Sequence, residues 1–200
     1  MSCRRCGTCC AKGGPALHGA DAALVLDGAV GLDQLVTLRA GEPVHDQLQD
    51  QILPLAAEII KIRGPHGLTG CVFHLGANAG CSIYQARPLE CRLLDCENPA
   101  PLAEVYAIDR LTRTDLLGPG HSLLELIRHH DKLCPAAEAF RLARDPALST
   151  RRALAELLSA DRALRSAFLD KTGASLHLAD FLLGRPLPEV LAPLGLRLSL

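Results

Sequence analysis

The clearest pattern of apolar and polar positions lies in the second half of the chain. Between residues 150 and 171, apolar side chains recur three or four positions apart, which is the period of an amphipathic helix. Ser149 or Thr150 is placed to cap the start of this segment, and Gly173 follows its end. The apolar set consists of Leu154, Leu157, Leu158, Leu164, Phe168 and Leu169.

Further helical patterns fill the rest of this half. From Pro101 onward the chain is rich in Leu, Ala and Arg. Because the patterned segments are separated by Gly and Pro, we expect a series of helices that pack as one layer. Their expected positions are 101–116, 121–133, 135–144, 150–171, 175–183 and 186–193.

The first half alternates short apolar runs with turn residues instead. The β-branched run at 58–63 predicts a strand that ends at Gly64-Pro65. The runs at 71–75 and 81–84 predict two more strands, separated by a glycine-bounded loop. Together these three segments predict a small antiparallel β-meander.

Other elements of the first half are shorter. Residues 21–28 predict a short helix, and residues 35–39 predict a strand. Residues 46–56 receive no assignment, because Pro54 interrupts a helical pattern. Arg87-Pro88 is expected to open a short helix that ends before Cys96.

Composition and charge narrow the function classes. Apolar residues make up 48% and charged residues 22%, as in a globular protein with a real core. The net charge is −1 and there is no basic block, so we expect no binding to nucleic acid. No apolar run reaches the roughly 18 residues of a membrane span, so no membrane association is expected. A protein partner or substrate stays open.

Eight of the nine cysteines form two groups. The first ten residues are polar, so a secretory signal is not predicted and a cytoplasmic location is expected. Reduced thiols in clusters bind metal rather than form disulfides. We therefore predict that both groups meet around metal, through Cys3, Cys6, Cys9, Cys10, Cys71, Cys81, Cys91 and Cys96.

The thiols alone leave the metal open. Eight thiolates satisfy two tetrahedral zinc sites, two four-cysteine iron–sulfur clusters, or one of each. Thiolate ligands suit both metals. Side chains of the adjacent residues Cys9 and Cys10 are expected to diverge, so that they serve two centres or one of them is spare.

The cysteine pattern resembles the CxxCxxCC cysteine-cluster family of zinc- or iron-chelating domains. The resemblance covers roughly the first half of the chain. At the cofactor site we expect Tyr84 to pack over the centre, with a catalytic phenol as the alternative. Arg87, which matches the family's Arg-Pro motif, is expected to bond carbonyls or a carboxylate such as Glu90, or alternatively to face an anionic substrate. The matching motifs are Cys3-x-x-Cys6-x-x-Cys9-Cys10, Cys71-Val72-Phe73-His74-Leu75, Cys81-Ser82-Ile83-Tyr84, Arg87-Pro88, Cys91-Arg92 and Cys96.

A longer relative in that family, the flagellin lysine methylase, is thought to carry an iron–sulfur cluster. This similarity shifts the expectation slightly from zinc toward iron–sulfur. It also implies an alternative function, an iron–sulfur enzyme of the protein methyltransferase type. A third alternative is an interaction module held together by structural zinc. No nucleotide-binding motif is present, so the sequence leaves open whether the protein is an enzyme.

The fold class expected from these patterns is α+β. Residues 1–100 form a cysteine-cluster metal-binding module with a small antiparallel β-meander. Residues 101–200 form a mostly α-helical half packed on that module, either as a separate domain or as part of one.

Residues outside the cysteine pattern receive plain structural predictions. Cys134 is expected to be a small buried hydrophobe at a helix end. The histidines near the cysteines are expected to be half-exposed: His18, His66 and His74. Those near 121–133 are expected at a solvated helix end: His121, His129 and His130.

Overall fold

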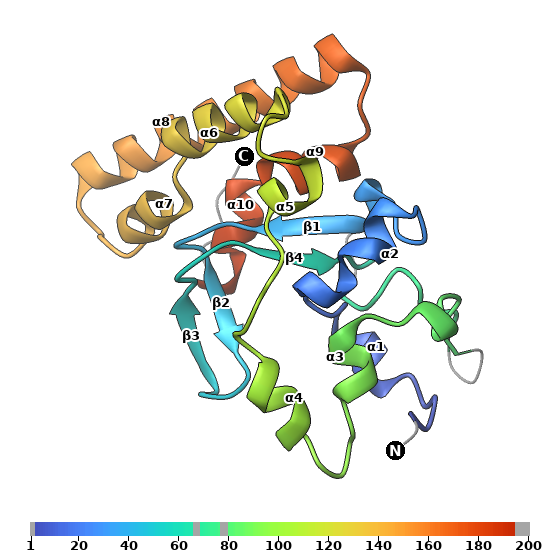
Figure 1. Cartoon of the computed structure of the whole chain (residues 1–200). Helices are drawn as coiled ribbons and strands as arrows, with labels where there is room; N and C mark the ends of the chain where they lie inside the picture. The colour runs from blue at the N-terminus through green and yellow to red at the C-terminus, as the bar shows by residue number, and fades with distance from the viewer. Residues whose placement is uncertain (1–2, 66–68, 77–79, 195–200) are drawn as a thin grey trace.

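The structure is a computed structural model that describes residues 3–65, 69–76 and 80–194, and it confirms the α+β class (Figure 1). The strands are β1 (Leu35–Leu38), β2 (Pro43–Asp46), β3 (Gln51–Pro54) and β4 (Ile59–Ile62). The helices of the cysteine-rich half are α1 (Thr8–Lys12), α2 (Ala22–Leu26) and α3 (Leu89–Leu93). The remaining helices are α4 (Ala100–Val105), α5 (Arg113–Leu117), α6 (Leu123–Leu133), α7 (Ala136–Ala143), α8 (Leu148–Thr172), α9 (Leu176–Leu183) and α10 (Leu187–Leu191).

Two antiparallel strand pairs form the β structure. β1 pairs with β4, so that Leu35 lies opposite Ile62, and β2 pairs with β3 in a hairpin. The hairpin occupies most of the stretch that the sequence left unassigned. Pro43 and Pro54 face each other at its open end, where neither needs to donate a ladder hydrogen bond.

An extended segment at residues 15–19 widens the β1–β4 sheet. The amide of Leu17 donates to the Ile60 carbonyl at 2.9 Å, which joins the segment to β4. On its other edge, the amide of Leu111 donates to the Leu17 carbonyl at 2.9 Å. Residues 15–19 therefore lie between β4 and residues 109–111, three stretches that are far apart in the sequence.

The predicted meander is only partly present. The strands expected at 35–39 and 58–63 are confirmed as β1 and β4. The strands expected at 71–75 and 81–84 are wrong, because these segments share only one bridge, between His74 and Cys81. Each segment turns directly after its cysteine, where the His74 amide bonds the Cys71 carbonyl at 2.9 Å and the Tyr84 amide bonds the Cys81 carbonyl at 3.2 Å.

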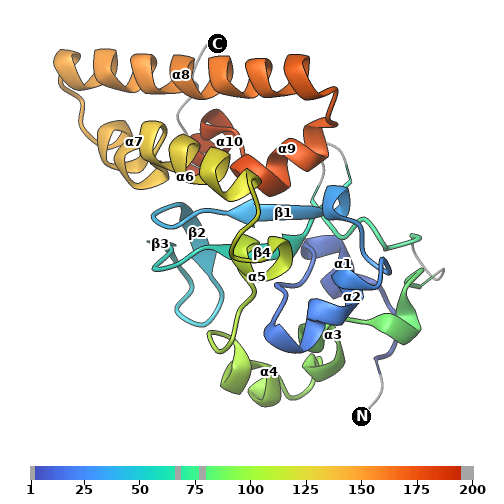
Figure 2. The same cartoon turned by 45° about the horizontal axis from the view of Figure 1, so that its top comes forward.

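Helices α6 to α10 form a layer over the sheet (Figure 2). α9 packs directly on β1, and α8 crosses above α6 and α7. The long helix expected at 150–171 is confirmed as α8. The helix expected at 101–116 is split into α4 and α5, because the amide of Gly19 bonds the Asp109 carbonyl and draws the chain between them into extended pairing.

The two halves share one hydrophobic core. Leu17 and Ile60 from the cysteine-rich half pack in the same cluster as Phe168 and Phe181 from the helical half. The Thr37 hydroxyl donates to the Phe181 carbonyl at 2.6 Å, in a fully buried position. One face of the sheet is therefore covered by the helices.

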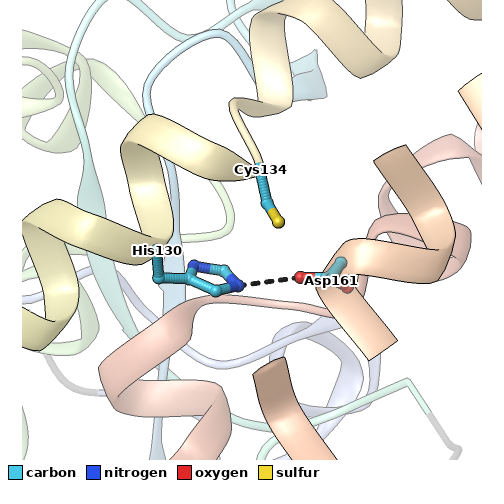
Figure 3. A group of neighbouring side chains, drawn as sticks. All are labelled: His130, Cys134 and Asp161. Atoms are coloured by element: carbon cyan, nitrogen blue, oxygen red, sulfur yellow. Dashed lines mark hydrogen bonds and ion pairs between the residues drawn. The ribbon is translucent and has the colours of Figure 1, made fainter. Parts of the chain in front are cut away.

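A second cluster of buried residues lies between α6, α7, α8 and α10. Cys134 is fully buried at the end of α6, as predicted, while the prediction of a solvated His130 is wrong, since only 1% of its surface is exposed. Its Nε2 lies 2.9 Å from Asp161 Oδ1 (Figure 3). His18 is also buried rather than half-exposed, and His66 lies outside the described residues.

Candidate metal centre

One groove, with a cavity volume of about 1720 Å³, collects the cysteines of both groups. Its walls come from the N-terminal loop and α1, from the 71–84 loop, from α3 with the loop that follows it, and from the β2–β3 hairpin. A metal bound by thiols of both cysteine groups requires that the two groups lie close together, as they do here. The lining thiols are Cys3, Cys6, Cys9, Cys10, Cys71, Cys81, Cys91 and Cys96.

Five of these thiols, which we call the inner cysteines, share one electrostatic neighbourhood. Burial and the nearby thiol of Cys9 raise the pKa of Cys10 to about 12. Burial also raises the pKa of Cys71, and Cys81 adds to that effect. The pKa of Cys91 is raised in the same way, first by burial and then by the four other inner thiols. In the metal-free protein, several inner thiols are therefore protonated at neutral pH.

The adjacent pair on α1 does not diverge, contrary to the sequence-based expectation. The sulfurs of Cys9 and Cys10 lie 4.0 Å apart. α1 is a single turn that follows Gly7, whose φ of 78° reverses the chain before the helix begins. Both thiols of the pair line the groove, where they can serve a common centre.

Hydrogen bonds to Asp21 and Ala16 fix the position of α3, which carries Cys91. The amide of Leu89 donates to Asp21 Oδ1 at 2.8 Å, at the start of the helix. The next residue of the helix, Glu90, accepts a hydrogen bond from the Ala16 amide through Oε2 at 2.8 Å. The bond to the fully buried Asp21 fixes the start of the helix. The bond to Ala16 holds α3, and Cys91 with it, against the extended segment at 15–19.

The remaining three thiols, which we call the outer cysteines, are Cys3, Cys6 and Cys96. Cys6 and Cys96 are exposed, and Cys3 is half-buried. An ion pair between Arg4 and Glu97 joins the loop of Cys3 to the loop of Cys96. The Cys6 thiol is exposed, and its sulfur lies 3.3 Å from Thr8 Oγ1. A hydrogen bond from this hydroxyl to the thiolate lowers the pKa of Cys6.

Tyr84 and Arg87 form the side of the groove near the outer cysteines. The guanidinium groups of Arg5 and Arg87 lie 3.9 Å and 3.8 Å from the centroid of the Tyr84 ring. Arg87 Nε donates to the Tyr84 carbonyl at 2.9 Å. Of the two partners expected for Arg87, the structure shows a carbonyl, while the Glu90 carboxylate bonds Ala16 and His18 instead.

The spacing of the thiols bears on the kind of centre they can hold. Among the described residues, no three of the eight grouped thiols lie within 4.8 Å of one another. A tetrahedral zinc ion with Zn–S bonds of about 2.3 Å holds its sulfurs about 3.8 Å apart. In a four-iron cluster each thiolate binds a different iron atom, so the thiolates stand farther apart.

The one compact ligand group among the described residues lies elsewhere, in the helical half, and consists of His130, Cys134 and Asp161. Arg165 already contacts Asp161 at 3.2 Å, and the Leu187 amide donates to it at 3.0 Å. Burial raises the pKa of Cys134 to about 11. With a protonated thiol and a carboxylate paired to arginine, this group serves the packing of the helices.

Comparison with known proteins gives one match. A family model named CxxCxxCC, with the description "Putative zinc- or iron-chelating domain", matches residues 2–110. No curated protein and no solved structure matches the chain. In the part of the chain that the structure describes, no helix is long and apolar enough to cross a membrane. The matched range contains every residue that lines the cysteine groove except Thr112.

Proposed function

Because the chain belongs to the CxxCxxCC family of zinc- or iron-chelating domains, we propose that it holds at least one iron–sulfur cluster in its cysteine groove. The observation that carries this proposal is the meeting of both cysteine groups in one groove. The ligands of the first cluster are four of the inner cysteines, which are Cys9, Cys10, Cys71, Cys81 and Cys91.

The choice of iron–sulfur over zinc is supported by spacing. Thiols that are spread more widely than a single zinc ion allows suit a cluster in which each cysteine binds its own iron atom. The outer thiols, Cys3, Cys6 and Cys96, are available to a second centre nearer solvent. We expect the protein to work in a reducing compartment such as the cytoplasm, because all nine of its cysteines are free.

The openness of the groove supports a role in transfer or sensing. The groove runs from the thiols to the β2–β3 hairpin and α4, so a bound centre is reached from outside the protein. A cluster held at such a site can exchange electrons with a partner protein or respond to the redox state of its surroundings. The groove gives a partner direct access to the centre without unfolding the module.

A zinc site is the second candidate, and one observation favours it. The 4.0 Å separation of the Cys9 and Cys10 sulfurs is close to the spacing within a zinc tetrahedron. In this alternative Cys9 and Cys10 bind one zinc ion, and two of the other inner thiols move closer to complete its coordination.

Metal analysis of protein purified without oxygen separates the two candidates. We expect iron and acid-labile sulfide in similar amounts, with a brown colour from charge-transfer absorbance. The Cys134→Ser variant is the matched control, because this thiol is buried outside the groove, and it should keep the same metal content. A colourless protein with stoichiometric zinc would replace the iron–sulfur proposal by the zinc alternative.

A further inference from the structure

Two cationic side chains, Lys61 and Arg110, line the bottom of the cysteine groove, which we call its floor. In the sheet that residues 15–19 complete, Ala16 lies opposite Lys61 of β4, and His18 lies opposite Arg110. Directly opposed residues, and residues two apart on one strand, point to the same face of a sheet. Lys61 and Arg110 therefore share a face of the sheet with Ala16 and His18.

The opposite face of this sheet is the hydrophobic core. Ile60 and Ile62, which flank Lys61 in β4, are buried in the main core cluster. Lys61 and Arg110 instead line the groove that contains the cysteines. A lone lysine in the middle of an apolar strand thus lines the groove.

Neither cation is neutralised by the protein. Among the described residues, no carboxylate lies within ion-pair distance of the Lys61 ammonium, and the ammonium donates no hydrogen bond to a side chain or carbonyl. Arg110 Nε donates to the Tyr106 carbonyl at 2.6 Å, and its guanidinium stacks on the Tyr106 ring at 4.5 Å. These contacts orient the Arg110 head but leave its charge unpaired.

Glu90, the carboxylate that acts on Lys61, already has other hydrogen-bond partners. Glu90 accepts from the Ala16 amide at 2.8 Å and lies 3.4 Å from His18 Nε2. Burial lowers the pKa of Lys61, Glu90 partly offsets that effect, and the like charge of Arg110 lowers it further. The two cations thus act on each other across the groove floor, an arrangement that an anion bound between them would stabilise.

We propose that Lys61 and Arg110 bind an oxyanion group, the phosphate or carboxylate of a small molecule, on the floor of the cysteine groove. Lys61 supplies a point charge from β4. Arg110 supplies the planar donor pair of its guanidinium, which suits both phosphate and carboxylate. The ligand would lie beside the inner cysteines, which gives a small anion access to any centre bound there. This goes beyond metal binding and does not depend on which metal is held.

Calorimetric titration of the protein as purified, with inorganic phosphate and separately with malonate, tests this proposal. We expect saturable binding of at least one of the two probes at one site, and the stronger of the two identifies the oxyanion class. Lys61→Gln and Arg110→Gln should each weaken that binding about tenfold or more, because a charge-assisted hydrogen bond is lost. Lys61→Arg, which keeps the charge, should retain most of the affinity.

The control variant is Lys132→Gln, since Lys132 is exposed on α6, away from the groove, and its affinity should equal that of the wild type. Metal content is measured in every sample, so loss of the centre is told apart from loss of the anion. If Arg110→Gln fails to fold, the Lys61 variants decide alone. The proposal is overturned if neither probe binds, or if Lys61→Gln binds as tightly as the wild type. Loss of metal with unchanged anion affinity would show instead that the two cations only balance the thiolates.

Discussion

Gly7 lies where the ring of His74 meets the N-terminal cysteine loop. Its φ is +78°, and a Cβ at this position would lie 2.5 Å from His74 Nε2. That nitrogen is buried and has no hydrogen-bond partner among the described residues. Glycine is therefore required here both by the left-handed backbone and by the close approach of the imidazole.

Replacement of this glycine should disturb the centre. We predict that Gly7→Ala destabilises the protein by about 1–3 kcal/mol, through backbone strain and the clash with His74, and lowers its metal content. Chemical denaturation and metal analysis measure both effects. The control is Gly120→Ala, where a Cβ would meet nothing within 4 Å. Equal stability and metal content in both variants would contradict the packing of His74 on the cysteine loop.

The inner thiols also predict how metal binding depends on pH. Burial raises the pKa of Cys10 to about 12, and it raises that of Cys71 and Cys91 as well, so these groups carry protons in the metal-free protein. Metal binds the thiolate form, so binding must release those protons. We predict that apparent metal affinity rises as pH increases from about 6 to 8. Competition with a chelator at several pH values measures this, and a pH-independent affinity would argue against ligation by these thiols.

At this scale the sequence was informative about chemistry and less so about burial. The eight thiols and Tyr84 were recognisable from spacing and motif, and the structure places all of them on one groove. His18 and His130 could not be recognised as buried, because their partners Glu90 and Asp161 are 72 and 31 residues away. The unusual position of Lys61, between isoleucines in a strand, was visible in the sequence but had no partner there to suggest a use.

Among the elements, α8 depends on one buried carboxylate. Asp161 is 1% exposed and joins α8 to His130 of α6 at 2.9 Å and to the Leu187 amide at the start of α10 at 3.0 Å. Burial alone would raise the pKa of Asp161. The hydrogen bond from His130, the charge of Arg165 and the Leu187 amide outweigh burial and bring this pKa down to about 2.

A lowered folded-state pKa makes the helical layer sensitive to acid. Because the ordinary value is 3.8, the stabilisation by ionised Asp161 is fully present above that pH and is lost as pH falls toward 2, by about 2 kcal/mol. We predict that Asp161→Asn is less stable than the wild type at pH 7 and that this difference shrinks between pH 4 and 2. Urea unfolding at several pH values measures it. Asp170→Asn on the same helix, where the carboxylate is exposed, should show little change.

Elements with a strong period were predictable and those set by distant pairing were not. The apolar stripe of 150–171 gave α8 almost to its ends. The 71–84 region has strand-like composition, yet its backbone turns after each cysteine. The break between α4 and α5 depends on pairing of Asp109 and Leu111 with residues 17–19, which the local sequence does not reveal.

Across the whole molecule, the helical half completes the core of the metal-binding module. Phe181 of α9 is fully buried in the same cluster as Leu35 of β1. Arg113 of α5 binds Glu58 through Nε at 2.9 Å and Nη2 at 2.6 Å, and its Nη1 donates to the Leu182 carbonyl at 2.7 Å. We propose that the two halves unfold as one cooperative unit.

Truncation of a shared core residue tests that proposal. We predict that Phe181→Ala lowers the free energy of unfolding by about 3–5 kcal/mol in a single transition, because a large side chain is lost from a fully packed site. Denaturation is followed by circular dichroism, which reports the helices, and by absorbance of the bound metal. Leu176→Ala, at a 62% exposed position of the same helix, should have little effect. Two separate transitions would show that the halves are independent domains.

Thiols from the N-terminal loop and from the middle of the chain are proposed to bind the same metal. The most direct test is the metal content of Cys10→Ser and Cys91→Ser, compared with Cys134→Ser, in protein purified without oxygen. Because four of the five inner cysteines are the proposed ligands, we predict that at least one of the first two variants loses the centre, and that Cys134→Ser retains it. Full metal content in both Cys10→Ser and Cys91→Ser would contradict a centre shared between the two cysteine groups.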